Sequence, residues 1–349
     1  MAGAGENVRI RLDPEDEYTH PVEAAENFNE SMYFNLFDAR GLGPVPVGGW
    51  FRLANRPNEG RGEMSCCVYL PDGRIGFMFK RPECTDNDAF DNGGMRFEVI
   101  TPFERLRLTY EGSLCVLDDP KQMLDPGTAF KNNPIVKSRI ELEFEGVSPM
   151  FGGEPVNADG SRIEQKAEES FARGHYEQHM AGKGRITIGD EQFEIDGFGL
   201  RDHSWGPRYW QAIHWYRWLP MNFGRDFAMM LSIVTGADGS QRQGGMVLEN
   251  GAYKLIREVT IASEYDEHDF QRSMVCTART DEREYRVTGE VRSLIPLRNR
   301  RTSPDGEALT TRITEGMTRY ECDGQVGWGL SEYLDQIVDG APVGRSTGS

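Results

Sequence analysis

Short stretches of alternating apolar and polar residues recur along the chain and predict a protein built almost entirely of β-strands. Each stretch is bounded by Gly, Pro, Asp or Asn, which is typical of antiparallel sheets closed into barrels or sandwiches. A Pro-Asp-Gly turn at 71–73 separates the first two predicted strands. The predicted strands cover residues 63–70, 76–80, 96–100, 105–110, 138–144, 185–188, 228–234, 253–260 and 284–292.

One helix is expected over residues 161–174. Ser161 and Glu164 have the spacing of a capping box, in which each side chain accepts a hydrogen bond from the other residue's backbone. The sequence IEQKAEESFA continues the helical pattern toward Gly174. The sequence therefore predicts an all-β protein with one or two short helices.

The chain contains an internal sequence repeat that predicts two related β-domains. Residues 50–73 (WFRLANRPNEGRGEMSCCVYLPDG) resemble residues 215–239 (WYRWLPMNFGRDFAMMLSIVTGADG), with the matching Trp-x-Arg motifs 165 positions apart. A chain of 349 residues also exceeds the usual size of a single core. We expect an N-terminal arm (1–19), a β-domain (20–150), a linker with the short helix (151–174), a second β-domain (175–339) and a tail (340–349).

Charge and composition exclude several classes of function. The net charge of −17 makes nucleic acid and anionic membranes poor partners. The N-terminus has no basic region followed by an apolar core, and no apolar run is long enough to span a membrane. The six cysteines include no CxxC motif and are interpreted as buried thiols. We expect a cytoplasmic protein, and the sequence leaves a homodimer open.

The stretch 197–218 (GFGLRDHSWGPRYWQAIHWYRW) holds four of the six tryptophans and two of the six histidines. Charged side chains among large aromatic residues suit a mostly apolar small-molecule pocket with a few placed polar groups. The competing interpretation is an ordinary pair of core strands whose polar residues are satisfied within the fold.

The alternation of side chains along a strand divides this segment into two faces. Arg201, His203 and Trp205 point one way, while Asp202 and its neighbours Ser204 and Gly206 point the other, unless a bulge reverses the assignment. His203 on the pocket face would serve as a general acid or base, because its ordinary pKa of about 6.5 permits proton exchange at neutral pH. Asp202 would face the barrel wall or orient a neighbouring side chain through a hydrogen bond.

These residues suit hydration, dehydration or proton-shuttle isomerisation, which needs a proton donor and aromatic walls that tolerate a developing cation. The catalytic candidates are His203, Asp202 and Glu332. The structural alternatives are core packing for at least half of the tryptophans and Arg–carboxylate pairs that pin strands. The candidate substrate-binding residues are Arg201, Trp205, Arg208, Tyr209, Trp210, His214, Trp215, Arg217, Trp218, Arg56 and Glu59.

The sequence predicts neither a metal nor an organic cofactor. His175 and His179 have the spacing of a helical metal site, but the helix is expected to end before them and a third ligand is missing. The GFGLRDHSWG run lacks the third glycine and the βαβ context of a dinucleotide-binding loop, and no GxSxG nucleophile elbow occurs.

Two motifs carry a resemblance to a known group. The run GxGxRDHSWG (197–206) and the ending GxSEY (329–333) resemble the hydroxyneurosporene synthase (carotenoid 1,2-hydratase)-like superfamily, and residues 52–82 resemble the N-terminal half of bacterial members. The resemblance implies a tandem calycin, or lipocalin-like, fold of two antiparallel β-barrels. That group includes carotenoid hydratases, kievitone hydratase-type enzymes and fungal Diels–Alderases, so the resemblance implies the fold more strongly than the reaction.

The first hypothesis is a cofactor-independent lyase or isomerase of the hydratase, dehydratase or cyclase type. It would act on an apolar terpenoid, steroid or aromatic molecule held between the two barrels. The alternative is a non-catalytic carrier of lipophilic molecules, because calycin barrels often serve as carriers. A scaffold protein is the third class, and the polar residues of 197–218 argue against it.

Overall fold

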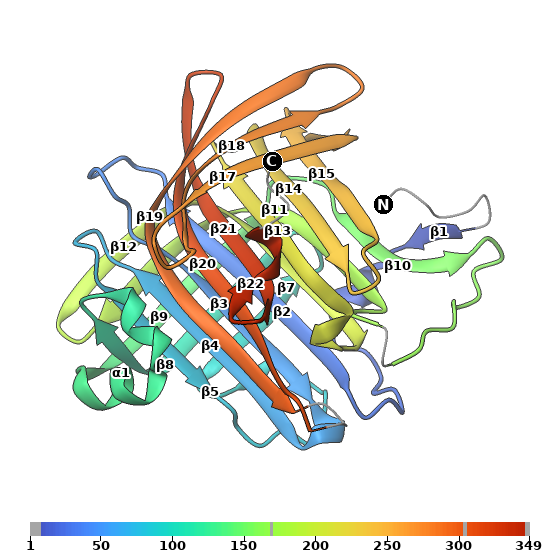
Figure 1. Ribbon diagram of the computed structural model, residues 1–349, viewed down its shortest axis with the longest axis horizontal. Helices are drawn as coiled ribbons and strands as arrows, with labels where there is room; N and C mark the ends of the chain where they lie inside the picture. Colours follow the sequence, from blue (N-terminus) through green and yellow to red (C-terminus); the bar gives the residue numbers. More distant parts are fainter. Residues whose placement is uncertain (1–7, 168–169, 303–305, 346–349) are drawn as a thin grey trace. The chain divides into compact units, whose positions relative to one another are not determined.

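The protein is described by a computed structural model that covers residues 8–167, 170–302 and 306–345. The chain forms two compact units, each with one large antiparallel sheet. Among the described residues, the first unit comprises 8–118, 130–167 and 170–209, and the second comprises 119–129, 210–302 and 306–345. The prediction of an all-β protein with two antiparallel β-units is confirmed (Figure 1).

The sheet of the first unit closes on itself. Its strands follow the order β11-β12-β2-β3-β4-β5-β8-β9, and β9 pairs with both β8 and β11, so these strands form a complete ring. Closure removes the exposed strand edges that an open sheet would leave. The strands of this unit are β1 (Val8–Arg11), β2 (Phe28–Asp38), β3 (Gly48–Arg56), β4 (Arg61–Tyr69), β5 (Ile75–Lys80), β6 (Asp91–Asn92), β7 (Met95–Thr101), β8 (Arg105–Leu117), β9 (Ile135–Gly146), β10 (Phe151–Asn157), β11 (Gly174–Ile188) and β12 (Glu191–Pro207).

The interior of this barrel is filled by alternate residues of each strand. In β9, Ile140, Leu142 and Phe144 are buried, whereas the glutamates between them are exposed. The same alternation in β2 and β3 sends Phe34 and Phe51 into one core cluster. The two-residue period of a strand thus converts the sequence pattern directly into a filled barrel.

The second unit is a curled sheet in the order β16-β15-β14-β13-β21-β20-β19-β18-β17. The segment 253–260, predicted as one strand, is two strands interrupted at Arg257, and these form opposite ends of that order. Its strands are β13 (Ile213–Asn222), β14 (Phe227–Gly236), β15 (Gln241–Glu249), β16 (Ala252–Ile256), β17 (Glu258–Tyr265), β18 (Gln271–Arg279), β19 (Glu284–Thr302), β20 (Ala308–Cys322), β21 (Gln325–Val338) and β22 (Ala341–Pro342).

The two segments of the internal repeat adopt the same local arrangement. Residues 50–73 run through β3 and β4 to the turn before β5, and residues 215–239 run through β13 and β14 to the turn before β15. In both turns an aspartate side chain accepts a hydrogen bond from the backbone two residues later, as Asp72 does from Arg74 and Asp238 from Ser240. The glycine that follows each aspartate has a positive φ, 96° at Gly73 and 80° at Gly239.

The boundary between the units differs from the one expected at 151–174. Strands β11 and β12 pair with β9 and β2, so the RDHSWG segment belongs to the first sheet. The chain passes to the second unit between Tyr209 and Trp210, after an earlier excursion over Asp119–Ala129. Strand pairing accounts for this boundary. The segment expected to be a linker, which is rich in Gly and Pro, contains strand β10, and β10 pairs with β11 over Phe151–Gly153.

The helix expected over 161–174 does not form in the described residues of that segment; residues 168 and 169 lie outside them. Ser161 instead donates its hydroxyl hydrogen bond to Asp159, and Arg162 forms a β-bridge with Val156. The capping serine is therefore engaged in a turn. The described helices are α1 (Pro126–Asn132) and the 3-10 turns η1 (Pro14–Glu17), η2 (Pro57–Glu59), η3 (Pro120–Leu124), η4 (Trp210–Ala212) and η5 (Val343–Arg345). Among the described residues, no helix is long and apolar enough to cross a membrane.

Candidate functional site

Strand β12 carries the RDHSWG segment and places Arg201, His203 and Trp205 on the interior face of the first barrel. All three contact Tyr176 of β11, which pairs directly with His203. The Arg201 guanidinium lies 5.1 Å from the centre of the Tyr176 ring, and the His203 and Trp205 rings lie 5.5 and 6.3 Å from it. These contacts agree with the face assignment expected from the alternation of the strand.

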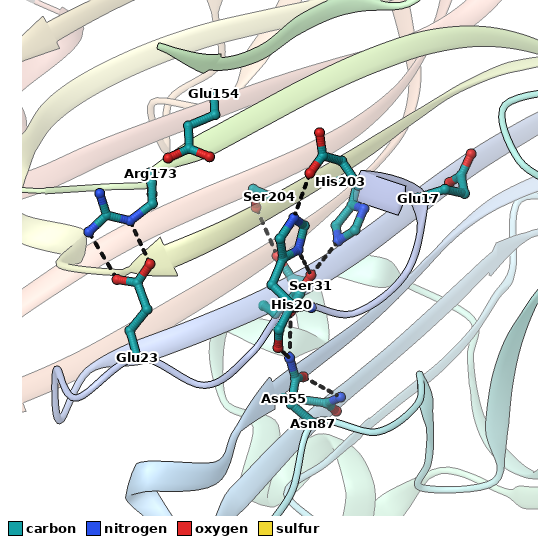
Figure 2. A network of polar contacts seen from close by, with 12 residues as sticks. Glu17, His20, Glu23, Ser31, Asn55, Asn87, Glu154, Arg173, His203 and Ser204 are labelled. Carbon is teal, nitrogen blue, oxygen red and sulfur yellow. Dashed lines mark hydrogen bonds and ion pairs between the residues drawn. The ribbon is translucent and has the colours of Figure 1, made fainter. Parts of the chain in front are cut away.

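Glu30 links two histidines inside the barrel, His20 and His203, both of which are labelled in Figure 2. Its Oε1 lies 2.6 Å from His20 Nδ1 and 2.8 Å from His203 Nε2. Its Oε2 accepts hydrogen bonds from the His20 backbone N–H and from Asn87 Nδ2. The outer nitrogen of His20 lies 3.2 Å from Asp16 Oδ1. The site thus joins the segment before β2 to strands β2 and β12.

The network continues from His203 to a buried ion pair. His203 Nδ1 lies 3.2 Å from the Tyr176 hydroxyl, which donates a hydrogen bond to Glu17 at 2.8 Å. Arg201 binds both oxygens of Glu17, at 2.6 and 2.8 Å, and the side chains of this pair are fully buried. Its Nε and Nη2 also donate to Gln178 Oε1, and its Nη1 donates to the Tyr176 hydroxyl.

The electrostatics of Glu30 and His20 follow from this geometry. Burial by itself raises the pKa of Glu30, but hydrogen bonds from His20 and His203 outweigh burial and lower that pKa to about 2. Burial lowers the pKa of His20, but the carboxylates of Glu30 and Asp16 outweigh it, so the net shift of the His20 pKa is upward. The cluster therefore stabilises an ionised Glu30.

His203 has no access to solvent and both of its ring nitrogens are engaged. Trp205 is equally enclosed, and its ring stacks on His20 at 4.1 Å between centroids. A general acid must come within hydrogen-bond reach of its substrate. The geometry therefore does not favour the proton transfer that the sequence suggested for His203, which occupies a closed structural network.

Asp202 lies on the opposite face of β12. It stands across from Tyr33 of β2 and Glu177 of β11 in the sheet. Its side chain retains partial solvent exposure and, among the described residues, has no hydrogen-bond or ion-pair partner. Burial raises the pKa of Asp202 to about 6, against the opposing effect of Arg208 and Arg52. An unpaired carboxyl of this kind can hold or release a proton.

Three hydrogen-bond donors without partners lie on the same face as Asp202. Asn35 pairs across the sheet with Trp50, and Tyr33 pairs with Arg52. Asn35 Nδ2, Trp50 Nε1 and Arg52 Nη2 are buried, and no described residue accepts a hydrogen bond from them. The Tyr33 and Trp50 rings stack with centroids 6.4 Å apart. Buried donors usually have acceptors, so this arrangement suits a ligand oxygen beside aromatic rings.

The other candidates of the first unit form structural pairs. Arg56 is fully buried and binds Glu59 and Asn29. Arg208 donates to the Ser204 hydroxyl at 2.6 Å, and Tyr209 is partly buried. The competing interpretation of arginines that pin strands describes these residues better than ligand binding does.

Six of the candidates belong to the second unit. Arg217 pairs with Asp335 at 3.0 Å, and its guanidinium lies over the rings of Trp215 and Tyr333. Glu332 accepts a hydrogen bond from the Tyr216 hydroxyl. The full set in this unit is Trp210, His214, Trp215, Arg217, Trp218 and Glu332. The boundary at Tyr209 thus divides the aromatic segment between two sheets.

Sequence comparison assigns the chain to a family. A family model described as "Domain of unknown function (DUF7064)" matches residues 13–337. The chain belongs to this family. A comparison with curated proteins gives no match.

Comparison of structures places this member of the DUF7064 family among calycin-like folds. An AttH-like protein from Nitrosomonas europaea is 13% identical with a TM-score of 0.59, and the alignment covers 95% of this chain and 98% of that one. CghA with Sch210972 is 12% identical with a TM-score of 0.52 and 89% coverage of both chains. Kievitone hydratase from Nectria haematococca is 8% identical with a TM-score of 0.52, covering 90% and 93%. The calycin-like fold expected from the motifs is therefore confirmed.

Sequence reasoning missed the residues that complete both faces of β12. Glu17 stands near the end of the segment interpreted as an arm, His20 is the first residue of the predicted β-domain, and Glu30 lies in β2, which was not among the predicted strands. Trp50 and Arg52 were noticed only as part of the repeat. His175 and His179 lie on strand β11, where a separation of four residues corresponds to about 13 Å, so they do not converge on a metal.

A surface hollow of about 440 Å³ lies in the second unit. Charged residues, among them Arg225, Glu249, Arg283 and Asp323, dominate its lining, and three of them are joined in ion pairs. None of the residues predicted from the sequence lines it. Its charge makes it a poor match for an apolar substrate.

Proposed function

We propose that this protein is an enzyme that transforms an apolar small molecule by proton transfer, in a reaction of the hydratase, dehydratase or cyclase type. Asp202 is the group that exchanges the proton. Asn35, Trp50 and Arg52 hold an oxygen of the substrate. Proton transfer of this kind needs no organic cofactor.

The observation that carries the proposal is Asp202, a partly exposed residue whose carboxyl is unpaired on a sheet face where buried donors also lack acceptors. Unpaired buried donors cost free energy unless a ligand satisfies them, which supports a binding role for this face. The name of one structural relative, kievitone hydratase, and the complex of another, CghA with Sch210972, agree with chemistry on a small organic molecule.

The chemistry follows from the position of these groups. In hydration, the protonated Asp202 donates its proton to an alkene carbon, and water adds to the resulting cation. The Asp202 carboxylate then receives the proton that the added water loses, which restores the acid. The stacked rings of Tyr33 and Trp50 stabilise the cation through their π-faces. Dehydration is the reverse sequence, and cyclisation replaces water with an internal nucleophile.

The test uses the full chain and a panel of terpenoid, steroid and flavonoid compounds. Chromatography with mass detection identifies a product that has gained or lost one water, or one of unchanged mass and altered retention. Asp202→Asn should reduce turnover by about 10²- to 10⁴-fold while binding of the same compound changes little. Asp196→Asn, an exposed carboxyl on the same strand, is the matched control.

Two results would count against this assignment. Full turnover in the Asp202→Asn protein would remove the proposed acid. Binding of panel compounds without conversion by the wild-type protein would favour the carrier alternative. Asn35→Leu and Trp50→Phe remove the proposed oxygen donors, and both should weaken binding of a substrate that carries a carbonyl or hydroxyl more than binding of its hydrocarbon analogue.

A further inference from the structure

We propose that His20, Glu30 and His203 bind one divalent transition-metal ion inside the first barrel. The His20 Nδ1, His203 Nε2 and Glu30 carboxylate oxygen all lie within 4.8 Å of one another. They come from the segment before β2, from β2 and from β12. The site lies on the opposite face of β12 from Asp202, and the inference does not rest on the proposed function.

The surroundings of each ligand already have the form of an outer coordination sphere. The ring nitrogen of His20 that faces away from Glu30 lies 3.2 Å from Asp16 Oδ1. The corresponding nitrogen of His203 lies 3.2 Å from the Tyr176 hydroxyl. Metal-bound histidines characteristically donate their second N–H to a carboxylate or another fixed oxygen. Each imidazole is thus oriented with its other nitrogen toward Glu30 Oε1.

The Glu30 carboxylate is held in the same way. Its Oε2 receives the His20 backbone N–H at 2.8 Å and Asn87 Nδ2 at 2.5 Å. Asn87 is in turn fixed by Asn55, which donates to its carbonyl oxygen at 3.0 Å. One oxygen is therefore anchored by the protein. The other, Oε1, is the atom that faces both imidazoles and remains available to a metal.

The charges of the buried cluster favour a divalent cation. Three carboxylates, those of Asp16, Glu17 and Glu30, are joined in one network with a single permanent cation, Arg201. The three carboxylates and Arg201 together leave a net negative charge of two, which either a second proton on each histidine or one divalent ion would balance. Buried charges require such compensation.

Hydrogen-bond directions show that a metal could replace the two bonds to Glu30 Oε1 and leave the outer contacts of both histidines in place. The Tyr176 hydroxyl donates to Glu17, so it accepts from Arg201 and from His203 Nδ1. His203 keeps that N–H when its Nε2 coordinates a metal. A divalent ion would therefore replace only the two protons that point at Glu30 Oε1 and would leave both imidazoles neutral. Two neutral imidazoles and a carboxylate are ligands that zinc takes.

Such an ion would fasten the N-terminal segment to the barrel wall. His20 follows η1, whereas the other two ligands belong to paired strands. Trp205 stacks on His20 at 4.1 Å and covers the cluster. Binding of a metal to the folded state alone adds to stability by mass action. The ion would thus act as a structural clip for this segment.

The test measures metal binding and does not involve catalysis. The full-length protein is freed of metal with a strong chelator and titrated with Co²⁺, whose visible absorption reports coordination by protein ligands. We expect one equivalent of Co²⁺ bound, its displacement by Zn²⁺ and a higher Tm with either ion. His20→Ala and Glu30→Gln should abolish the Co²⁺ spectrum. Asp16→Asn should weaken Co²⁺ binding by about 10- to 100-fold, the usual effect of an outer-sphere change.

The controls separate this site from adventitious binding and from misfolding. His268→Ala removes an exposed histidine of the second unit and should leave the titration unchanged. His20 is partly exposed and lies outside the strands, so His20→Ala should retain the wild-type far-ultraviolet circular dichroism spectrum. Asp202→Asn should bind Co²⁺ as the wild type does, whatever becomes of its turnover.

Two outcomes would overturn the inference. The first is a folded wild-type protein that takes up neither Co²⁺ nor Zn²⁺ at micromolar concentration. The second is uptake that persists unchanged in both His20→Ala and Glu30→Gln.

Discussion

Replacing Arg201 by methionine removes the only guanidinium that contacts Glu17 within the described residues. Both side chains of the pair are fully buried. In the wild-type protein Arg201 makes two bonds to Glu17, two to Gln178 and one to Tyr176. After the substitution, Glu17 keeps only the Tyr176 hydroxyl and the backbone N–H of Phe103. A buried carboxylate is then left without its counter-charge.

The magnitude follows from this loss. Breaking a buried ion pair by removing one partner costs about 3–5 kcal/mol, because the remaining charge stays desolvated. For a folding unit of this size, each kcal/mol lowers Tm by about 2–4 °C. We therefore expect Tm of the first unit to fall by roughly 6–20 °C. Urea unfolding followed by circular dichroism gives the change in free energy directly.

A matched exposed pair and a double variant sharpen this test. Arg185 and Glu194 join the neighbouring strands β11 and β12 at 2.7 Å, but both side chains are about half exposed. Arg185→Met should cost no more than about 1 kcal/mol. Combining Arg201→Met with Glu17→Gln removes the stranded charge and should recover part of the lost stability. A loss below about 1 kcal/mol for Arg201→Met alone would refute the reasoning, because it would mean that Glu17 is not held as a buried anion.

Two further predictions concern packing and thiol chemistry. A Cβ at Gly174 would collide with the Trp205 ring, so Gly174→Ala should lower the free energy of unfolding in urea by about 1–3 kcal/mol. No side chain lies near Gly43, so Gly43→Ala should change the free energy of unfolding by less than about 1 kcal/mol. Equal effects of the two substitutions would contradict the packing argument. Burial raises the pKa of Cys276 to about 12, so its thiol should react with a disulfide reagent only after unfolding. The partly exposed Cys84 should react first. Rapid modification of more than one thiol in the native state would contradict this expectation. The thiols expected to be protected are Cys66, Cys67, Cys115, Cys276 and Cys322.

Local patterns were enough to locate a strand in each of the nine predicted stretches, although other strands, among them β2, β20 and β21, were not predicted. Alternation at Ile140, Leu142 and Phe144 fixes both the strand and its buried face, because the period of a strand is a property of its backbone. The pairing of β2 with β12 could not be predicted in this way, since it joins residues more than 150 positions apart in the chain. For that reason local patterns gave no sign that the chain passes to the second unit after Tyr209.

The candidate site shows the same limit. The two faces of β12 could be assigned from the sequence, which placed His203 and Asp202 on opposite sides. The side chains around His203 and Asp202 decide what each residue can do. Glu30 and Tyr176 contact His203 because strands β2 and β11 pair with β12. The metal ligands proposed here are likewise too widely spaced along the chain to form a recognisable motif. Unpaired donors at Asn35 and Trp50 become visible only when every acceptor around them is known.

Closure of the first barrel by β11 and β12 has a consequence for synthesis of the protein. Until Pro207 has left the ribosome, β2 lacks the partner that covers one of its edges, although β3 through β9 are already available. An unpaired edge is a template for intermolecular association, and contacts of such long range form slowly. A nascent chain therefore exposes this unpaired edge from the synthesis of β2 until β12 follows, and a fragment ending near residue 150 would expose it permanently. Chaperones that shield extended segments would be most needed during that interval.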